Sequence, residues 1–139
     1  MQRPLAEIHG IELSVDDTLG WPKILGDQSK LMQVFVNLVV NALDADREAG
    51  GRTILINHAV EHDHLVIRIE DEGPGMPAEV ASQLFRPFFS TKAQGTGLGL
   101  AIVKKIVDLH GGTIALRPRE RQGTVAEVRL RLAPPVRGE

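Results

Sequence analysis

Apolar residues recur along this chain with two different periods. The stretches HLVIRIED, from residue 64, and TVAEVRLRL, from residue 124, alternate apolar with polar side chains, which is the period of a β-strand with one buried face. Between residues 28 and 49, apolar residues return every three or four positions, as in an α-helix. The whole pattern predicts strands at residues 11–15, 53–60, 64–71, 112–118 and 124–132, and helices at residues 28–49, from Pro77 onward, and at residues 97–110.

The first long helix has recognisable ends and one apolar face. Asp27 is a residue type that caps helix N-termini, and the pair Gly50-Gly51 is typical of a helix end. Its expected apolar stripe consists of Leu31, Phe35, Leu38, Ala42 and Ala45. A helix with one dry stripe needs a partner surface to cover that stripe.

The strands can supply that surface. Leu65, Ile67 and Ile69 fall on one side of their strand, and Val66, Arg68 and Glu70 fall on the other. In the last strand, one side carries Ala126, Val128, Leu130 and Leu132, and the other carries charges. Strands with one wet face and helices with one dry stripe predict a two-layer α/β sandwich.

Composition and charge limit the function classes. The chain has 139 residues, 42% of them apolar, which is enough for one domain with one core. With 16 basic and 18 acidic residues, the net charge of -2 favours neither nucleic acid nor an anionic membrane as a partner. The chain has no cysteine, which excludes disulfides and thiolate chemistry, and its N-terminus shows no apolar signal segment. We therefore expect a soluble cytoplasmic domain whose anion-binding sites are local.

Three alternate glycines stand where the second long helix should begin. Gly95, Gly97 and Gly99 occur in the stretch QGTGLGLAIVKK, although glycine lowers helix propensity by about 1 kcal/mol per position. At a helix N-terminus, free backbone N–H groups and the helix dipole favour an anion, and glycine allows a phosphate to approach closely. Thr96 can add a hydroxyl donor. The alternative is a flexible loop that merely precedes a helix.

A second group of polar and glycine residues ends a predicted strand, in EDEGPGMP. Asp71 is followed by Gly73 and Gly75, so a carboxylate is backed by a loop with almost no side-chain bulk. Such a carboxylate can accept a hydrogen bond from an exocyclic amine, and a flat base could lie against the glycine backbone. The alternative is a tight turn with solvated acids.

The third group is NLVVNALDA in the first long helix. Asn37 and Asn41 lie four positions apart, so both project from one side of the helix, where asparagine is a poor helix former. An amide oxygen is a hard ligand suited to Mg²⁺, which completes its shell with waters and substrate phosphates. The alternative is two asparagines on the wet face.

Taken in order, these motifs resemble one family. NLVVNALDA, DEGPG, LFRPFFSTK and GTGLGLAIVKKIVDLHGG look like the N box, the first glycine box, the F box and the second glycine box of sensor histidine kinases. The resemblance runs from about Ile11 to Leu132. It implies the Bergerat ATP-binding fold, a mixed sheet layered on helices with a mobile lid over the nucleotide. The short lid is similar to that of the nitrogen-regulation and oxygen-sensing subgroup.

The resemblance implies a role for each matching residue. Asp71 would bind the adenine amine, and Asn41 would hold Mg²⁺ beside ATP or ADP. Asn37 would be a catalytic residue, at the position where DNA gyrase and heat-shock chaperones carry a water-activating glutamate. Lys92 or Arg86 in the lid would neutralise γ-phosphate charge. The implied nucleotide-binding residues are Asn41, Asp71, Gly73, Gly75, Met76, Thr91, Lys92, Gly95, Thr96, Gly97, Leu98, Gly99, Leu100 and Thr124. Phe85, Phe88 and Phe89 would anchor the lid.

The chain also departs from the family pattern. The usual phosphoacceptor histidine motif on a helical hairpin does not occur, and Val125 and Ala126 stand where an aromatic residue is common. We expect His9, His58, His62 and His64 to be surface residues and His110 to be structural.

The resemblance and these departures together imply a single catalytic and ATP-binding domain over residues 1–139, with its core at about 11–132. It would be monomeric when isolated, and it would act on a phosphoacceptor hairpin outside the chain and, through it, on a response regulator. The parent kinase could be membrane-bound. Two alternatives remain, a Bergerat-fold ATPase and a regulatory nucleotide-binding module like the anti-sigma factors.

Overall fold

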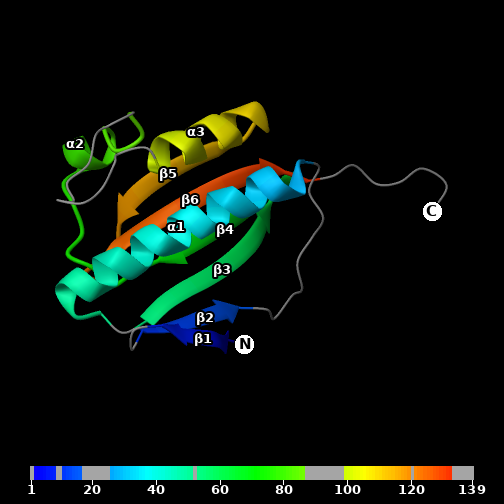
Figure 1. Cartoon of the computed structure of the whole chain (residues 1–139). Helices are drawn as coiled ribbons and strands as arrows, with labels where there is room; N and C mark the ends of the chain where they lie inside the picture. Colours follow the sequence, from blue (N-terminus) through cyan, green and yellow to red (C-terminus); the bar gives the residue numbers. More distant parts are fainter. Residues whose placement is uncertain are drawn as a thin grey trace.

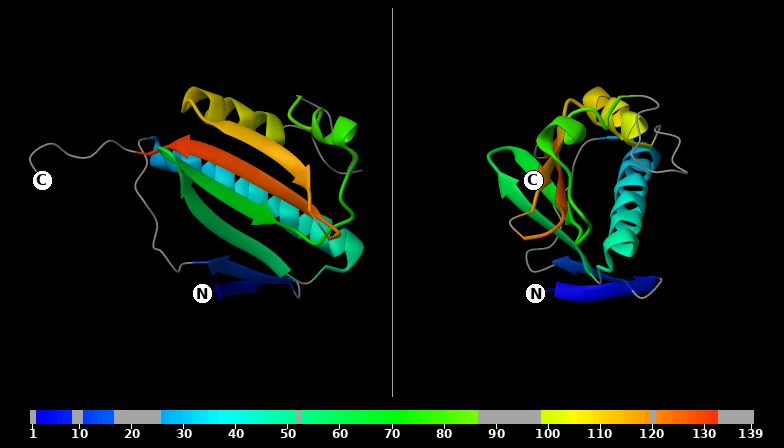
Figure 2. Two further views of the ribbon diagram at one scale, coloured as in Figure 1. Left: turned by 180° about the vertical axis from the view of Figure 1, so that it is seen from behind. Right: turned by 90° about the vertical axis from the view of Figure 1, so that its left-hand side faces the viewer.

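The protein consists of one mixed β-sheet with its helices on one side. The computed structural model describes residues 2–8, 11–16, 26–51, 53–86, 99–119 and 121–132. Figure 1 and the side view in Figure 2 show α1 and α3 against the same face of the sheet. The elements are β1 (Gln2–Ile8), β2 (Ile11–Asp16), α1 (Gln28–Ala49), β3 (Thr53–Glu61), β4 (His64–Glu70), α2 (Ala78–Ala81), α3 (Gly99–Leu109), β5 (Thr113–Pro118) and β6 (Thr124–Arg131). The predicted two-layer α/β sandwich is confirmed.

The sheet has the strand order β1-β2-β3-β4-β6-β5. The pairs β3–β4, β4–β6 and β6–β5 are antiparallel. Strand β2 runs parallel to β3 and is connected to it through α1. The sequence pattern did not predict β1, which pairs with β2 at the edge of the sheet. Its segment contains Pro4, which is tolerated on an edge strand, and the pairing register shifts between Pro4 and Ala6.

Helix α1 has the ends that the sequence predicts. The Asp27 side chain accepts a hydrogen bond from the Lys30 N–H at 3.1 Å, and Gly50 closes the helix with a φ of 75°. Because a left-handed φ is strained for residues with a Cβ, glycine is the fitting residue at this C-cap. The predicted boundaries of α1 are confirmed.

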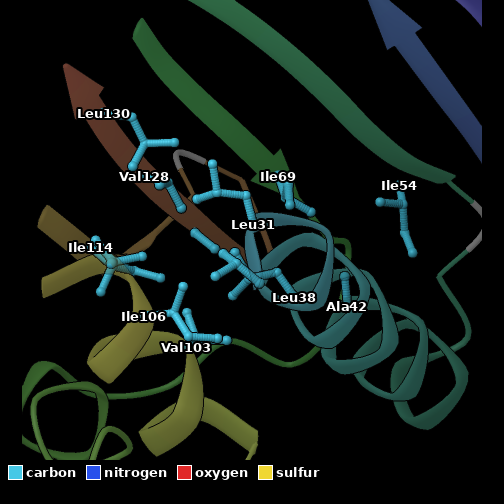
Figure 3. Close-up of a cluster of buried hydrophobic side chains, with 13 residues drawn as sticks. Leu31, Leu38, Ala42, Ile54, Ile69, Val103, Ile106, Ile114, Val128 and Leu130 are labelled. Carbon is cyan, nitrogen blue, oxygen red and sulfur yellow. The ribbon is translucent and has the colours of Figure 1, made fainter. Parts of the chain in front are cut away.

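The core lies between the two long helices and the inner face of the sheet. Figure 3 shows Leu31, Leu38 and Ala42 of α1 directed toward side chains of α3 and of the strands. These three residues are buried as predicted, Phe35 packs against the core from its edge, and Val34, which was not predicted, is fully buried. The cluster is completed by Ile54, Ile69, Val103, Ile106, Val107, Ile114, Ala126, Val128 and Leu130. This packing fixes α1 and α3 side by side on the sheet.

The outer face of the sheet carries a network of charges. Glu127, only 4% exposed, accepts hydrogen bonds from Arg68, Arg117 and Arg129. Val66 lies opposite Arg129 on this face and is fully buried, so the prediction that this side of β4 is wet is wrong for Val66. Long arginine side chains can cover a small apolar residue with their methylene groups.

The other two helices begin close to their predicted positions. Helix α2 starts at Ala78, and the carbonyl oxygen of Pro77 accepts the Ala81 N–H at 3.0 Å, so Pro77 stands one residue before the helix. Helix α3 starts at Gly99 among the described residues, and the predicted positions 97 and 98 lie outside them. It ends at Leu109, one residue earlier than predicted.

The histidines differ in their surroundings. His110 joins the two long helices, because its Nε2 accepts the Asp27 N–H at 3.0 Å and its Nδ1 lies 2.8 Å from the Ile106 carbonyl oxygen. The predicted structural role of His110 is confirmed. His62 is exposed, whereas His58 and His64 are half-buried and thus less exposed than predicted. His58 shares the inner face of β3 with apolar residues, and His9 lies outside the described residues. Among the described residues, no helix is long and apolar enough to cross a membrane.

Candidate functional site

Asp71 forms the centre of the candidate site, at the end of β4. It is 7% exposed, and its Oδ1 accepts hydrogen bonds from the backbone N–H groups of Gly73 at 2.9 Å and Thr124 at 3.2 Å. The Asp71 N–H in turn donates to the Thr124 carbonyl oxygen at 2.9 Å. The carboxylate is therefore held in one orientation by the backbone of β6 and of the loop after β4. The alternative of a turn with solvated acids does not apply to Asp71.

Glycines allow the chain segments around Asp71 to approach one another. A Cβ at Gly123 would overlap the Asp71 carbonyl oxygen, and a Cβ at Gly73 would lie 2.6 Å from the Ala45 Cβ. Gly75 has a φ of 74° and lies beside the Gly123 carbonyl oxygen. The sequence analysis predicted the low bulk at Gly73 and Gly75 but did not single out Gly123. Close packing of the chain therefore requires glycine at positions 73 and 123, whether or not a ligand ring binds beside them.

Asn37 and Asn41 lie on α1, the helix that packs against α3. Both are half-buried, so the alternative of two asparagines on a fully wet face does not hold. The Asn37 Nδ2 lies 3.5 Å from the carbonyl oxygen of Gly99, the first residue of α3, which is a long hydrogen bond. Asn37 therefore contacts the start of the helix where the sequence predicts an anion site.

Several predicted site residues can be placed only in part. Gly99 and Leu100 form the first turn of α3, Thr124 is buried at the start of β6, and Met76 is half-buried in the loop after Asp71. Thr91, Lys92, Gly95, Thr96, Gly97 and Leu98 lie outside the described residues, as do Phe88 and Phe89. Phe85 packs against the hydrophobic core, which agrees with its predicted anchoring role, and Arg86 is exposed.

The structure adds a buried carboxylate that the sequence analysis did not identify. Asp46 on α1 has no exposed surface, and its Oδ1 accepts the Glu72 N–H at 2.6 Å. Within the part of the chain that the structure describes, its Oδ2 has no hydrogen-bond partner. A signal existed in the sequence, because Asp46 continues the apolar stripe one turn after Ala42.

The surroundings of Asp46 disfavour its charged form. Burial raises the pKa of Asp46 to about 6, the bond from the Glu72 N–H opposes this rise, and the negative charges of Asp71 and Glu72 add to it. The Arg119 guanidinium lowers the pKa slightly. The side chain of Glu72 itself accepts the Thr53 N–H at 2.7 Å, so it too is held close to the end of α1.

The arrangement suits a planar group with an amine donor. A carboxylate can accept about four hydrogen bonds, and the bonds from Gly73 and Thr124 both go to Asp71 Oδ1, which fixes the plane of the group. Among the described residues, no group of three or more histidine, aspartate or glutamate side chains could hold a metal ion. Amide oxygens, waters and ligand phosphates are further ligands that Mg²⁺ accepts.

Replacing Asp46 with asparagine should change how stability depends on pH. The pKa of Asp46 is about 6 in the folded chain, above its ordinary value of 3.8, so the folded chain binds more protons between these values. The contribution of Asp46 to the free energy of unfolding of the wild type is thus greatest below about pH 4 and falls as pH rises through 6. Because asparagine does not titrate, the melting temperature of Asp46→Asn relative to wild type should rise between about pH 4 and 7, by the equivalent of on the order of 2 kcal/mol. If the difference in melting temperature between the two proteins stayed constant over this range, the raised pKa of Asp46 would be contradicted.

Comparisons with known proteins agree on one family. Residues 26–134 match the family described as "Histidine kinase-, DNA gyrase B-, and HSP90-like ATPase". The sensory histidine kinase/phosphatase NtrB of Azospirillum brasilense is 40% identical over 122 residues, which cover 78% of this chain and 30% of NtrB. This chain spans less than a third of the length of NtrB and of sporulation kinases A, C and E of Bacillus subtilis, which it also matches.

Solved structures give the same result. The catalytic domain of the histidine kinase ThkA superposes with a TM-score of 0.68 and 36% identity, over 78% of this chain and 70% of that one. Full-length ShkA, solved in complex with AMPPNP, gives a TM-score of 0.69 with 25% identity, over 84% of this chain and 24% of that one. Together with the fold and the buried carboxylate at the end of β4, these matches show that the chain belongs to the histidine kinase-, DNA gyrase B- and HSP90-like ATPases, as an ATP-binding catalytic domain of the sensor histidine kinase type.

Proposed function

We propose that this chain binds Mg²⁺-ATP and transfers its γ-phosphoryl group to a histidine on a helical hairpin outside the chain. The observation that carries the proposal is the Asp71 carboxylate, buried at a strand end and oriented by two backbone N–H groups. The relatives supply the reaction type, since they are named as histidine kinases.

Asp71 would recognise the base of the nucleotide. Its carboxylate is an acceptor, so it complements the exocyclic amine of adenine, whereas guanine has a carbonyl oxygen at that position. The glycine backbone at Gly73 and Gly75 would lie against the flat ring, with Met76 and Thr124 bordering it. The complex of ShkA with AMPPNP, an ATP analogue, supports an adenine nucleotide as the ligand.

The phosphates would lie toward α1 and the start of α3. Gly99 opens α3, whose N-terminal N–H groups and dipole favour an anion. Gly95, Thr96, Gly97, Leu98 and Leu100 would complete this cradle, with Thr91, Lys92 and Arg86 as lid residues near the γ-phosphate; these roles stay predictions.

The amide of Asn41 fits a metal-binding role. It is half-buried on α1, one turn beyond Asn37, which contacts the first residue of α3. Mg²⁺ held by the Asn41 oxygen and the phosphates would neutralise phosphate charge during transfer.

Asn37 favours transfer over hydrolysis. An amide cannot take a proton from water at neutral pH, so the chain lacks at this position the base that a hydrolytic enzyme needs. This counts against a Bergerat-fold ATPase. A regulatory nucleotide-binding module like the anti-sigma factors remains the second candidate, because nucleotide binding alone is compatible with it.

The parent protein would be a two-component kinase of the nitrogen-regulation and oxygen-sensing subgroup, whose short lid the segment PFFSTKAQGTGLGL resembles. Residues 1–139 would form its single catalytic domain, monomeric in isolation, with a core at about 11–132. Its partners would be its own phosphoacceptor hairpin and a response regulator. If the chain uses ATP as proposed, the reaction would take place in the cytoplasm, including in a membrane-bound parent.

Base selectivity tests the Asp71 assignment. A buried mispaired polar group costs about 1–3 kcal/mol, so ATP should bind about tenfold or more tightly than GTP. Asp71→Asn should weaken ATP binding and narrow the difference in affinity between ATP and GTP, because the new amide nitrogen faces the adenine amine as a second donor. Titration calorimetry with both nucleotides measures this, with the exposed Asp108→Asn as the matched control. Equal affinity of the wild type for ATP and GTP would refute the assignment.

The metal assignment has its own test. Asn41→Ala removes the oxygen ligand but leaves the adenine pocket intact, so ATP binding should lose most of its magnesium dependence. Calorimetry with and without magnesium on both proteins measures the increment. If magnesium increased ATP affinity as much in the variant as in the wild type, Asn41 would not be the metal ligand.

Transfer itself can be measured in trans. Phosphoryl transfer needs an acceptor in line with the γ-phosphate, and this chain lacks the expected acceptor histidine motif. The chain alone should bind Mg²⁺-ATP without labelling itself or hydrolysing ATP quickly. Adding the parent kinase's helical hairpin should give acid-labile histidine labelling that saturates with hairpin concentration. Rapid hydrolysis by the chain alone would favour the ATPase, and tight binding without any transfer would favour the regulatory module.

A further inference from the structure

The loop that follows β4 has all three of its first backbone N–H groups bonded to a specific acceptor. The Asp71 N–H donates to the Thr124 carbonyl oxygen, and the Gly73 N–H donates to the Asp71 carboxylate. The Glu72 N–H, between them, donates to the Asp46 carboxylate at 2.6 Å. Of these three bonds, only the one from Glu72 has its acceptor on a helix, namely Asp46 of α1.

Asp46 is itself held firmly at the end of α1. Its backbone carbonyl oxygen accepts the Gly51 N–H at 2.7 Å, and a Cβ at Gly51 would lie 2.8 Å from the Asp46 Cγ. The side chain has no exposed surface. Gly73, the residue after Glu72, packs against Ala45, the residue before Asp46. The last turns of α1 and the loop after β4 therefore form one packed unit.

A carboxylate is an unfavourable choice at this position unless it does something there. Burial without an ion pair is costly for a charge, and a negative charge in the last turn of a helix opposes the helix dipole. One carboxylate oxygen has no partner among the described residues. An apolar residue would continue the stripe of Leu38 and Ala42 without these costs, but it could not accept the Glu72 N–H.

We propose that Asp46 is a positioning residue that fixes the Asp71 carboxylate relative to α1 and thereby sets the selectivity of the site for adenine over guanine. This inference rests on the proposed base contact of Asp71. The bond to Glu72 N–H ties the residue next to Asp71 to the helix that carries Asn37 and Asn41. Without it, the Glu72 N–H loses this acceptor and the loop can shift to find another. The Asp71 carboxylate, although still bonded to Gly73 and Thr124, then moves relative to α1. An acceptor that is free to turn or move away discriminates poorly between an amine and a carbonyl oxygen.

A positioning role for Asp46 would change the ratio of ATP to GTP affinity, whereas a purely stabilising role would not. Loss of stability alone lowers the folded fraction and leaves the ratio of ATP to GTP affinity unchanged, whereas a misplaced Asp71 lowers that ratio. Asp46→Ala removes the acceptor, and Asp46→Asn keeps an acceptor oxygen at the same distance from the backbone. Val107→Ala, in the core at the far end of α3 from Gly99, is the matched control for destabilisation.

Titration calorimetry of the chain with ATP and GTP separates these possibilities. We expect Asp46→Ala to lose about tenfold or more of the ATP-to-GTP affinity ratio, and Asp46→Asn and Val107→Ala to keep it within about twofold. If Asp46→Ala does not fold, Asp46→Ser serves in its place, because its hydroxyl is polar but too short to reach the Glu72 N–H in the same position. A ratio unchanged in the alanine or serine variant, or lost equally in the asparagine variant, would overturn the inference.

The outcomes also separate this inference from the proposed function. If the wild type prefers ATP and Asp71→Asn loses that preference while Asp46→Ala keeps it, only the role of Asp46 fails. If the wild type shows no preference for ATP, the base contact of Asp71 fails, and the role of Asp46 fails with it.

Discussion

The hydrogen bonds between Asp71 and Thr124 determine how the rest of the site can be arranged. The two residues exchange backbone and side-chain bonds at the end of neighbouring strands, and the contact is so close that residue 123 must be glycine. A buried carboxylate is tolerable only when hydrogen bonds compensate for its lost hydration, and here the backbone supplies them. The carboxylate is consequently rigid, which is the property that a recognition group needs.

Helix α1 combines two roles that usually compete. One side supplies Leu31, Leu38 and Ala42 to the core, which fixes the position of the helix on the sheet. Another side presents Asn37 and Asn41, and its last turns hold the loop after β4 through Asp46. Because the same rigid element serves both, the distance between the asparagines and Asp71 is set by core packing and does not depend on a flexible loop.

Much of this architecture could be predicted from the sequence, and the exceptions have physical causes. The caps at Asp27 and Gly50 and the alternation in β4 and β6 are local signals, and the structure confirms the elements they predict. Val66, Glu127 and Asp46 could not be judged in this way, because their burial depends on arginines or loops from distant parts of the sequence. Edge strand β1 was missed since Pro4 and a shifted register hide its period. The motif EDEGPGMP singles out Asp71, whose role in a binding site stays a prediction. The orientation of its carboxylate could not be judged locally, because besides Gly73 it depends on Gly123 and Thr124, 52 and 53 residues further along the chain.

That separation along the chain has a consequence for folding. Gly73 lies close to Asp71 in the sequence, but Thr124, the other residue that orients its carboxylate, is distant, and α1 separates β2 from its partner β3. Contacts of this kind form late and together, since the chain entropy lost in closing long loops is recovered only when the complete topology is reached. A partly folded chain would therefore lack the site altogether and would not bind the ligand with reduced affinity. A ligand that binds there stabilises the native state as a whole, by about 2.7 kcal/mol at a concentration 100 times its Kd, and slows the opening of strands that it never touches.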